Sequence, residues 1–252
     1  MTGTQIAVVK GLTWIGYPPS FTLSPADAFA ALDPEDDDMV KNQSGFAVYS
    51  KTNAKWIGTL NVMEPGKGYI YSSEAAGSKT FTYPSTAPAG GAAKIKAYVE
   101  PYDYFFEPIA PETYPGNMVM IAQVLQDGLP VEGIEVAAFV GGECRATIVS
   151  DADGYLFLLV PGNRAETMEL HAYTGGEEVL LNLPFTYQTD LRLGTLTKPV
   201  LLDIAGMATS IDKVKNRRDA DYYDLGGRKL NRRPQQKGVY IRGNEKVVVK
   251  NK

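Results

Sequence analysis

Residues 127–162 read DGLPVEGIEVAAFVGGECRATIVSDADGYLFLLVPG, and this stretch decides the fold. Short apolar runs rich in Val, Ile, Leu and Phe alternate in it with turn signals. The turns are predicted at Asp127-Gly128, Gly141-Gly142 and Asp151–Gly154, where glycine reaches positive φ without steric cost. The runs between them predict strands over residues 135–140, 144–149 and 155–160.

The same pattern continues on both sides of this stretch. Further strands are expected over residues 118–125, 167–173, 178–183 and 191–196. Strands spaced about 8–12 residues apart with intervening turns are typical of an antiparallel β-sandwich. We therefore predict that residues 117–205 form a β-sandwich module.

Residues 1–85 predict a smaller, β-rich module with one short helix. Strands are expected over residues 6–9, 12–17, 40–50, 55–60, 68–72 and 81–83. Ser24 is a favoured helix N-cap, Pro25 suits the first helical position, and Pro34 should end the helix. The large aromatic residues expected to supply the core are Trp14, Phe46, Trp56, Tyr69 and Phe81.

An acidic run, Glu35–Asp38, follows the predicted helix. Several carboxylates close together could ligate Ca²⁺, because hard cations prefer oxygen ligands. The run lacks the spaced ligands of a dedicated calcium loop, and consecutive acids cannot easily all face one ion. We therefore expect a solvated loop here.

Residues 86–116 are rich in proline and tyrosine and predict a linker between the two modules. A cluster of aromatic residues lies in it. On a surface these rings could stack on sugars, since flat aromatic faces offer a large apolar area with geometric specificity. The alternative is that the cluster fills the interface between the modules, because exposed patches of that size are uncommon. The candidate ligand-binding residues are Tyr102, Tyr104, Phe105 and Phe106.

The single cysteine, Cys144, excludes an intrachain disulfide. The single histidine, His171, lies on a predicted strand of the same module, so a Cys–His pair is conceivable by count. The simpler interpretation is that Cys144 is a small core residue. We predict no catalytic residues, no metal site and no cofactor.

Residues 206–252 form a basic tail, with 13 Lys/Arg against 5 Asp/Glu, whereas residues 1–205 hold 12 against 24. Alternating apolar residues and the Gly226-Gly227 and Gly243-Asn244 turns predict three short antiparallel strands. Such a small sheet is marginally stable alone. The opposite charges of tail and body could attract each other or another acidic surface.

The segments YDLGGRKL and KGVYIRGNEKVVVK of this tail resemble the type IX secretion sorting domain of secreted and surface proteins of the Bacteroidota. The resemblance implies recognition by an export machine and a location outside the cell or on its outer surface. Gly-Asn-Glu-Lys departs from the commoner Asn-Gly-Lys-Lys turn. The tail positions that carry the resemblance are Tyr223, Asp224, Leu225, Gly227, Arg228, Lys237, Gly238 and Tyr240.

The remainder of the chain is similar to modules that precede such tails. The motifs WIGYP, SPADAFAAL, VKNQSGFAVY, KWIGTL and EPGKGYIYSS resemble a repeated module of the same surface proteins. Residues 127–162 resemble an immunoglobulin-like or carboxypeptidase-regulatory-like module, with Ala137 and Ala146 in place of small glycines. The resemblance attaches no reaction to either module.

No apolar run is long enough to span a membrane, and no signal peptide is visible at the N-terminus. Because an exported protein needs a leader, we expect this chain to be part of a longer protein. The fold expected is mainly β: two small antiparallel modules and a short β tail. The predicted function is non-catalytic display, adhesion or binding of a glycan or protein partner, without nucleic acid. The alternatives are an accessory region of a larger surface hydrolase and an enzyme using Cys144 and His171.

Overall fold

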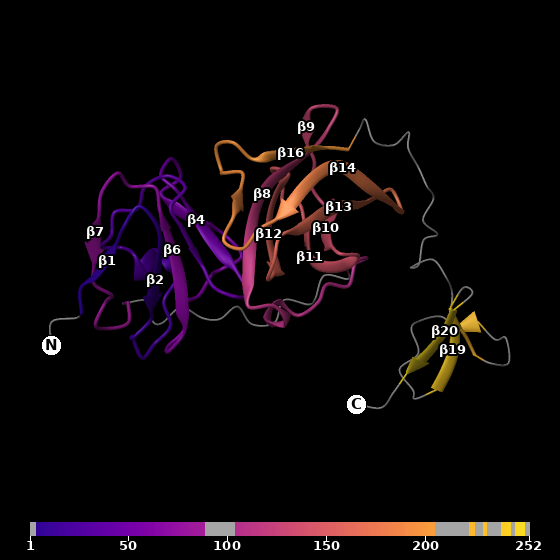
Figure 1. Cartoon of the computed structure of the whole chain (residues 1–252), viewed down its shortest axis with the longest axis horizontal. Helices are drawn as coiled ribbons and strands as arrows, with labels where there is room; N and C mark the ends of the chain where they lie inside the picture. The colour runs from indigo at the N-terminus through magenta and orange to yellow at the C-terminus, as the bar shows by residue number, and fades with distance from the viewer. Residues whose placement is uncertain are drawn as a thin grey trace.

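The computed structural model describes residues 4–88 and 104–204, together with four tail strands at 222–224, 229–230, 238–242 and 245–249. The described chain is mainly β, as predicted, with one α-helix and one 3-10 turn (Figure 1). Within the described residues, no helix has both the length and the apolar character needed to cross a bilayer.

The first module is built on a five-stranded antiparallel sheet of order β2-β6-β3-β4-β5. A short pair, β1 with β7, lies beside it. The strand predicted over residues 40–50 is in fact two strands, because Asn42 makes a turn: its Oδ1 accepts a hydrogen bond from the Gly45 N–H at 2.9 Å. The strands are β1 (Ile6–Val8), β2 (Gly11–Gly16), β3 (Met39–Lys41), β4 (Phe46–Ser50), β5 (Lys55–Gly58), β6 (Gly68–Ser73) and β7 (Lys79–Phe81).

The helix α1 (Pro25–Ala28) begins as the sequence predicts, since the Ser24 hydroxyl accepts a hydrogen bond from the Asp27 N–H at 3.1 Å. It ends after a single turn, well before Pro34. The backbone leaves helical geometry at Phe29, whose ring packs on Tyr71 and Phe81 with centroids 5.0 and 5.3 Å away. Core packing of this ring accompanies the early end of the helix.

The second module is a sandwich of two sheets that share one apolar core. One sheet has the order β11-β10-β13-β14 and is antiparallel. In the other, β8 pairs antiparallel with β12 and parallel with β15 and β16. The strands are β8 (Gly116–Gln126), β9 (Leu129–Pro130), β10 (Glu135–Val140), β11 (Glu143–Val149), β12 (Tyr155–Gly162), β13 (Glu166–Thr174), β14 (Glu177–Tyr187), β15 (Arg192–Leu193) and β16 (Val200–Asp203).

The parallel pairs differ from the purely antiparallel sandwich that the sequence predicts. After β14 the chain crosses to the other sheet and follows the free side of β8. A strand that arrives by a crossover is not constrained to run antiparallel, as a hairpin partner is. The immunoglobulin-like comparison remains a prediction.

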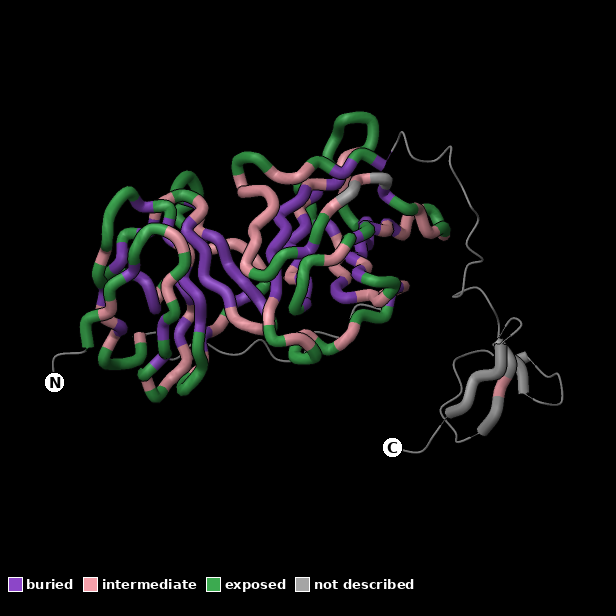
Figure 2. The backbone as a smooth tube through the Cα atoms, viewed as in Figure 1, coloured by how far each residue is buried: buried purple, intermediate pink, exposed green. Residues whose placement is uncertain are grey.

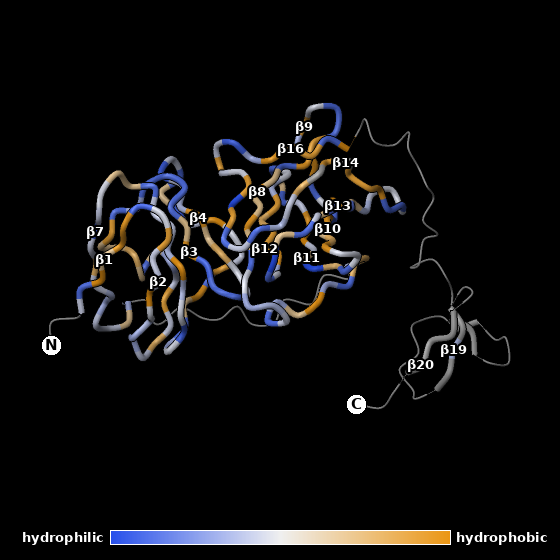
Figure 3. The backbone as a smooth tube through the Cα atoms, viewed as in Figure 1, coloured by the Kyte–Doolittle hydropathy of each residue, from blue (hydrophilic) through white to orange (hydrophobic). Residues whose placement is uncertain are grey.

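Strand β8 is buried on both of its faces. Met118, Met120 and Ala122 face the core of the second module, whereas Val119 and Ile121 pack in a second cluster with the first module. A strand covered on both sides reads as a continuous apolar run, as residues 118–122 do. Figure 2 shows the buried backbone continuing through both modules, and Figure 3 shows hydrophilic residues gathered in the loops.

Candidate binding site

The aromatic segment 104–106 packs on the outer face of the β10–β11–β13 sheet. The Phe105 ring stacks on Tyr173 with centroids 4.1 Å apart and planes inclined by 8°. Phe106 meets Phe139 edge-on at 5.7 Å. The rings therefore cover the outside of one sheet, whereas the alternative interpretation had placed them between the modules.

The carboxylate of Glu135 fixes this segment. It is 2% exposed and accepts hydrogen bonds from the N–H groups of Phe105 at 2.7 Å and Phe106 at 2.8 Å. Phe106 is itself buried, so its ring has no face open to a sugar. Tyr104 and Phe105 are half-buried, and Tyr102 lies outside the described residues. The candidate stacking surface is thus reduced to parts of two rings.

Cys144 and His171 do not form a catalytic pair. They lie on β11 and β13, which flank β10 on opposite sides. Burial raises the pKa of the Cys144 thiol to about 12, the opposite of what a nucleophile needs. The His171 Nδ1 lies 2.7 Å from Glu178 Oε1. This geometry removes the Cys–His enzyme hypothesis.

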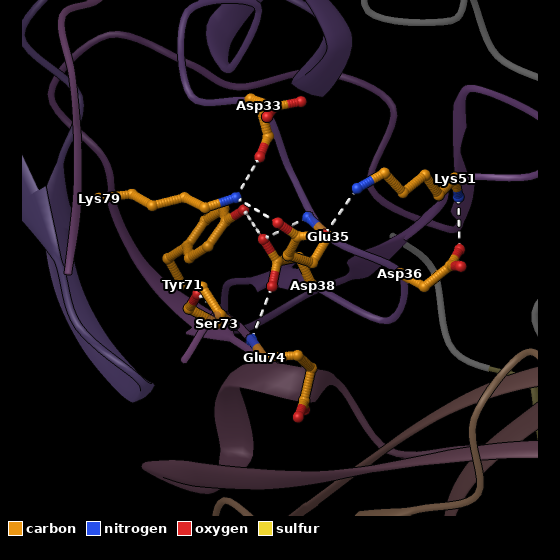
Figure 4. Close-up of polar contacts among 10 residues, drawn as sticks. Asp33, Glu35, Asp36, Asp38, Lys51, Tyr71, Ser73, Glu74 and Lys79 are labelled. Atoms are coloured by element: carbon orange, nitrogen blue, oxygen red, sulfur yellow. Dashed lines mark hydrogen bonds and ion pairs between the residues drawn. The ribbon is translucent and has the colours of Figure 1, made fainter. Parts of the chain in front are cut away.

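The acidic run joins several segments of the structure through its side chains, as a hub of polar contacts, and the prediction of a solvated loop is wrong at its last residue, Asp38. Asp38 is fully buried. Its carboxylate accepts hydrogen bonds from the Tyr71 hydroxyl at 2.7 Å, the Glu74 N–H at 2.7 Å and the Glu35 N–H at 3.0 Å (Figure 4). A carboxylate with three donors is stable away from water without a metal ion. Burial, and next the charge of Asp38, raise the pKa of Tyr71.

Glu35 holds the outer side of this hub. Its two carboxylate oxygens each lie 2.7 Å from an ammonium group, that of Lys51 and that of Lys79 (Figure 4). These hydrogen bonds lower the pKa of Glu35 to about 2, with the lysine charges adding to the effect. Each carboxylate is thus already satisfied by the protein. Across the part of the chain that is described, no group of His, Cys, Asp and Glu could hold a metal ion.

The acidic run also joins the two modules. Arg192 of β15 donates to the Asp37 carbonyl at 2.6 Å and to Glu74 at 2.5 Å. The Leu196 N–H donates to Asp37 Oδ1 at 3.0 Å. A segment that composition marks as a surface loop is therefore part of an interface.

A buried lysine forms the second polar connection between the modules. Lys41 is 1% exposed, and its ammonium group donates to Asp190 Oδ1 at 2.7 Å, Asn117 Oδ1 at 2.8 Å and the Asn117 carbonyl at 3.2 Å. An ammonium group has three hydrogens, so all three are used. Asn117 in turn donates to the Asn42 carbonyl at 3.0 Å. The apolar centre of the interface lies beside this pair and contains Met39, Phe46, Val48, Val119, Ile121 and Phe157.

A cleft of about 290 Å³ opens next to Lys41, where the second module overhangs the sheet of the first. Its floor follows one row of the sheet, because Ile70 pairs with Trp14 on one side and with Lys41 on the other. Its wall comes from residues 115–117 and from Asp190 of the second module. The lining residues are Trp14, Lys41, Asn42, Gln43, Gly68, Tyr69, Ile70, Pro115, Gly116, Asn117, Thr189 and Asp190.

Trp14 lies at the rim of this cleft and is 77% exposed, so its predicted place in the core is wrong. Strand β2 is an edge strand, and Trp14 points to the outer face of the sheet while Ile15 points to the core. The alternation of residues 12–16 gave the signal, since Leu12, Trp14 and Ile15 cannot all face one side. Tyr69 and Phe81 are core residues as predicted, Phe46 is buried between the modules, and Trp56 is half-buried.

A second hollow, of about 310 Å³, lies within the second module beside Gly141-Gly142. Its charged lining residues are Glu166 and Glu169, and its aromatic residue, Phe139, already packs on His171 at 4.5 Å. No exposed aromatic face is available there. The cleft between the modules is therefore the stronger candidate binding site.

The described tail strands form a sheet of order β18-β17-β19-β20. Its strands are β17 (Tyr222–Asp224), β18 (Lys229–Leu230), β19 (Gly238–Arg242) and β20 (Glu245–Val249). Register pairs Tyr223 with Ile241 and Asp224 with Tyr240, so the two halves of the tail motif meet across neighbouring strands. Four tail positions, Leu225, Gly227, Arg228 and Lys237, lie outside the described residues.

No protein-family model matches this chain, and no curated protein matches it.

Proposed function

We propose that this chain is an exported, non-catalytic cell-surface protein of a Bacteroidota bacterium whose two modules bind a glycan or protein partner. The tail, in this proposal, is the address that the type IX export machine reads. The observation that carries the proposal is the tail motif itself: Asp224 and Tyr240 belong to separate halves of the motif and pair in one small sheet. An immunoglobulin-like ancestry of the second module belongs to the same proposal.

The docked modules supply the binding part of the proposal. The interface has an apolar centre and an ion pair between the buried Lys41 and the partly exposed Asp190, and it holds the two surfaces beside each other. Binding sites frequently lie at domain interfaces, where a concave surface forms without cost to either core. The cleft at this interface offers an exposed aromatic ring beside polar groups.

Export can be tested in a Bacteroidota host that has a type IX machine. The chain, placed behind a leader peptide, is compared with a version that lacks residues 206–252 and with Asp224→Ala. We expect protease added to intact cells to degrade the complete chain and to spare the truncated one. Lys252→Ala is the matched control, since it removes a charge outside the motif. A truncated chain that still reaches the surface, or a complete chain that stays in the cytosol with its tail intact, contradicts the proposal.

A further inference from the structure

We infer that the cleft between the modules binds a neutral oligosaccharide or polysaccharide, with one sugar ring stacked on Trp14 and its hydroxyl groups hydrogen-bonded to the wall that carries Asp190. This inference rests on the proposed binding function and names its site and ligand class.

The floor offers an aromatic face. Trp14 is the most exposed of the large apolar residues described, at 77%, and it continues a buried row through Ile70 to Lys41. Removing the exposed apolar face of the indole from water is favourable, and a flat apolar partner stacked on it would do so. The C–H face of a pyranose is such a partner, and stacking leaves its hydroxyl groups at the ring edge.

The wall offers hydrogen-bonding groups at the edge of that face. Asp190 uses Oδ1 for Lys41, while its Oδ2 accepts no hydrogen bond from any described residue, and its side chain is 35% exposed. Thr189 lies beside it in the lining of the cleft. A carboxylate oxygen held in place by a buried ammonium group is a fixed acceptor for sugar hydroxyls.

The charge and size of the cleft favour a neutral saccharide. Among the described residues that line it, the only charged side chains are Lys41 and Asp190, which neutralise each other. An anionic ligand would find no unpaired cation there. The volume of about 290 Å³ lies just below the range of about 300–1,000 Å³ for small-molecule sites. It suits a short stretch of a sugar chain that extends beyond the cleft.

The test uses the complete chain on an array of neutral glucans, mannans, xylans, galactans and chitin oligomers, followed by titration with the glycans that bind. We expect Trp14→Ala to weaken binding roughly tenfold or more, because the stacked area is lost. Leu201→Ala is the matched control: Leu201 is also exposed, at 56%, but lies on β16, away from the cleft. The glycan affinity of Leu201→Ala should equal that of the wild type.

A second variant blocks the cleft without touching Trp14. A Cβ added at Gly68 meets no heavy atom within 4 Å, and Gly68 lines the cleft, so we expect the side chain of Gly68→Leu to occupy part of the cleft. We expect it to reduce glycan binding at least as much as Trp14→Ala. Gly77→Leu is its control, because a Cβ there also meets open space and Gly77 does not line the cleft.

Each outcome separates the inference from the proposed function. Glycan binding that survives both cleft variants overturns the inference and leaves a binding function at another surface. A wild-type chain that binds no neutral glycan, but binds an acidic glycan or a protein, also overturns it. Failure of export, measured separately in cells, counts against the proposed function whatever the array shows.

Discussion

The outer face of the first module's sheet has two halves, one covered by the second module and one exposed. Around β3 and β4, Met39, Phe46 and Val48 are buried against the second module. Around β2, on the same face of the same sheet, Leu12 and Trp14 remain 42% and 77% exposed. Both halves carry large apolar residues, so composition does not distinguish them.

One apolar sheet face is therefore partly covered by the neighbouring module and partly open to solvent. The covered half packs against the second module. The open half lies beside the cleft, next to the residues of the second module that line it. Adjacent exposed apolar residues such as Leu12 and Trp14, at the edge of a cleft, offer apolar surface that a ligand or partner can cover. The two halves can be told apart by substitution.

Truncating a large side chain in the covered half should lower the free energy of unfolding most. Phe46 is fully buried and packs 6.1 Å from Phe157 of the second module. Phe46→Ala should lower the free energy of unfolding by about 3–5 kcal/mol, as for other buried phenylalanines. Leu12→Ala, on the uncovered half, should change it by no more than about 0.5 kcal/mol. Urea unfolding measures both, and equal effects would erase the distinction between the halves.

Neutralising the buried carboxylate of the hub should come next. Asp38→Asn keeps the shape but turns one acceptor oxygen into a donor, so at least one of the three N–H and O–H groups around it loses its partner. We expect a loss of about 1.5–3 kcal/mol. Asp33→Asn is the control, because Asp33 takes part in the hub through its backbone carbonyl. A harmless Asp38→Asn would show that the run is solvated after all.

Removing the ammonium group of Lys41, which lies between the two halves, should lower the free energy of unfolding by a smaller amount. Lys41→Met keeps the apolar stem and removes the ammonium group, which leaves two acceptors of Asn117 and one of Asp190 without their donor. Asp190 is partly exposed and can regain water, so we expect a loss of about 1–2 kcal/mol, below that of a fully buried pair. Lys55→Met, at an exposed position, should stay within about 0.5 kcal/mol. A Lys41→Met protein as stable as the control would mean that the ion pair adds nothing to docking.

The stabilising contribution of the Glu35 ion pairs should be lost in acid, so it can be measured by lowering the pH. Because the folded-state pKa lies at about 2, below the ordinary 4.5, the contribution of Glu35 is complete above about pH 4.5 and is lost as pH falls towards 2. Between pH 5 and pH 2, the free energy of unfolding should therefore fall less steeply in Glu35→Gln than in the wild type. Glu132→Gln, whose side chain makes no ion pair with any described residue, should follow the wild type. Identical slopes for Glu35→Gln and wild type would remove Glu35 from the hub.

Strand positions could be predicted from the sequence because they depend on local signals. The turns at Gly141-Gly142 and the N-cap at Ser24 act within a few residues, and the strands and the helix start follow from them. The alternation of residues 12–16 places Trp14 and Ile15 on opposite faces of the strand, and the expectation of Trp14 in the core did not use this signal.

The candidate site could not be predicted, because it depends on contacts between distant segments. Asp37 and Arg192 are 155 residues apart, and Lys41 and Asp190 are 149 apart. Nothing local distinguishes an acidic run in water from one with buried partners. Likewise, the rings of Phe105 and Phe106 read as a binding surface until Glu135 is known to hold their backbone.

The claim on which the cleft depends is that the two modules are docked as one unit, and calorimetry of the complete chain tests it most directly. We predict one cooperative transition for the two modules, with equal calorimetric and van't Hoff enthalpies, and its separation into two transitions in Phe46→Ala. Two independent transitions in the wild-type chain would contradict the account, because modules that unfold separately cannot maintain a binding cleft between them.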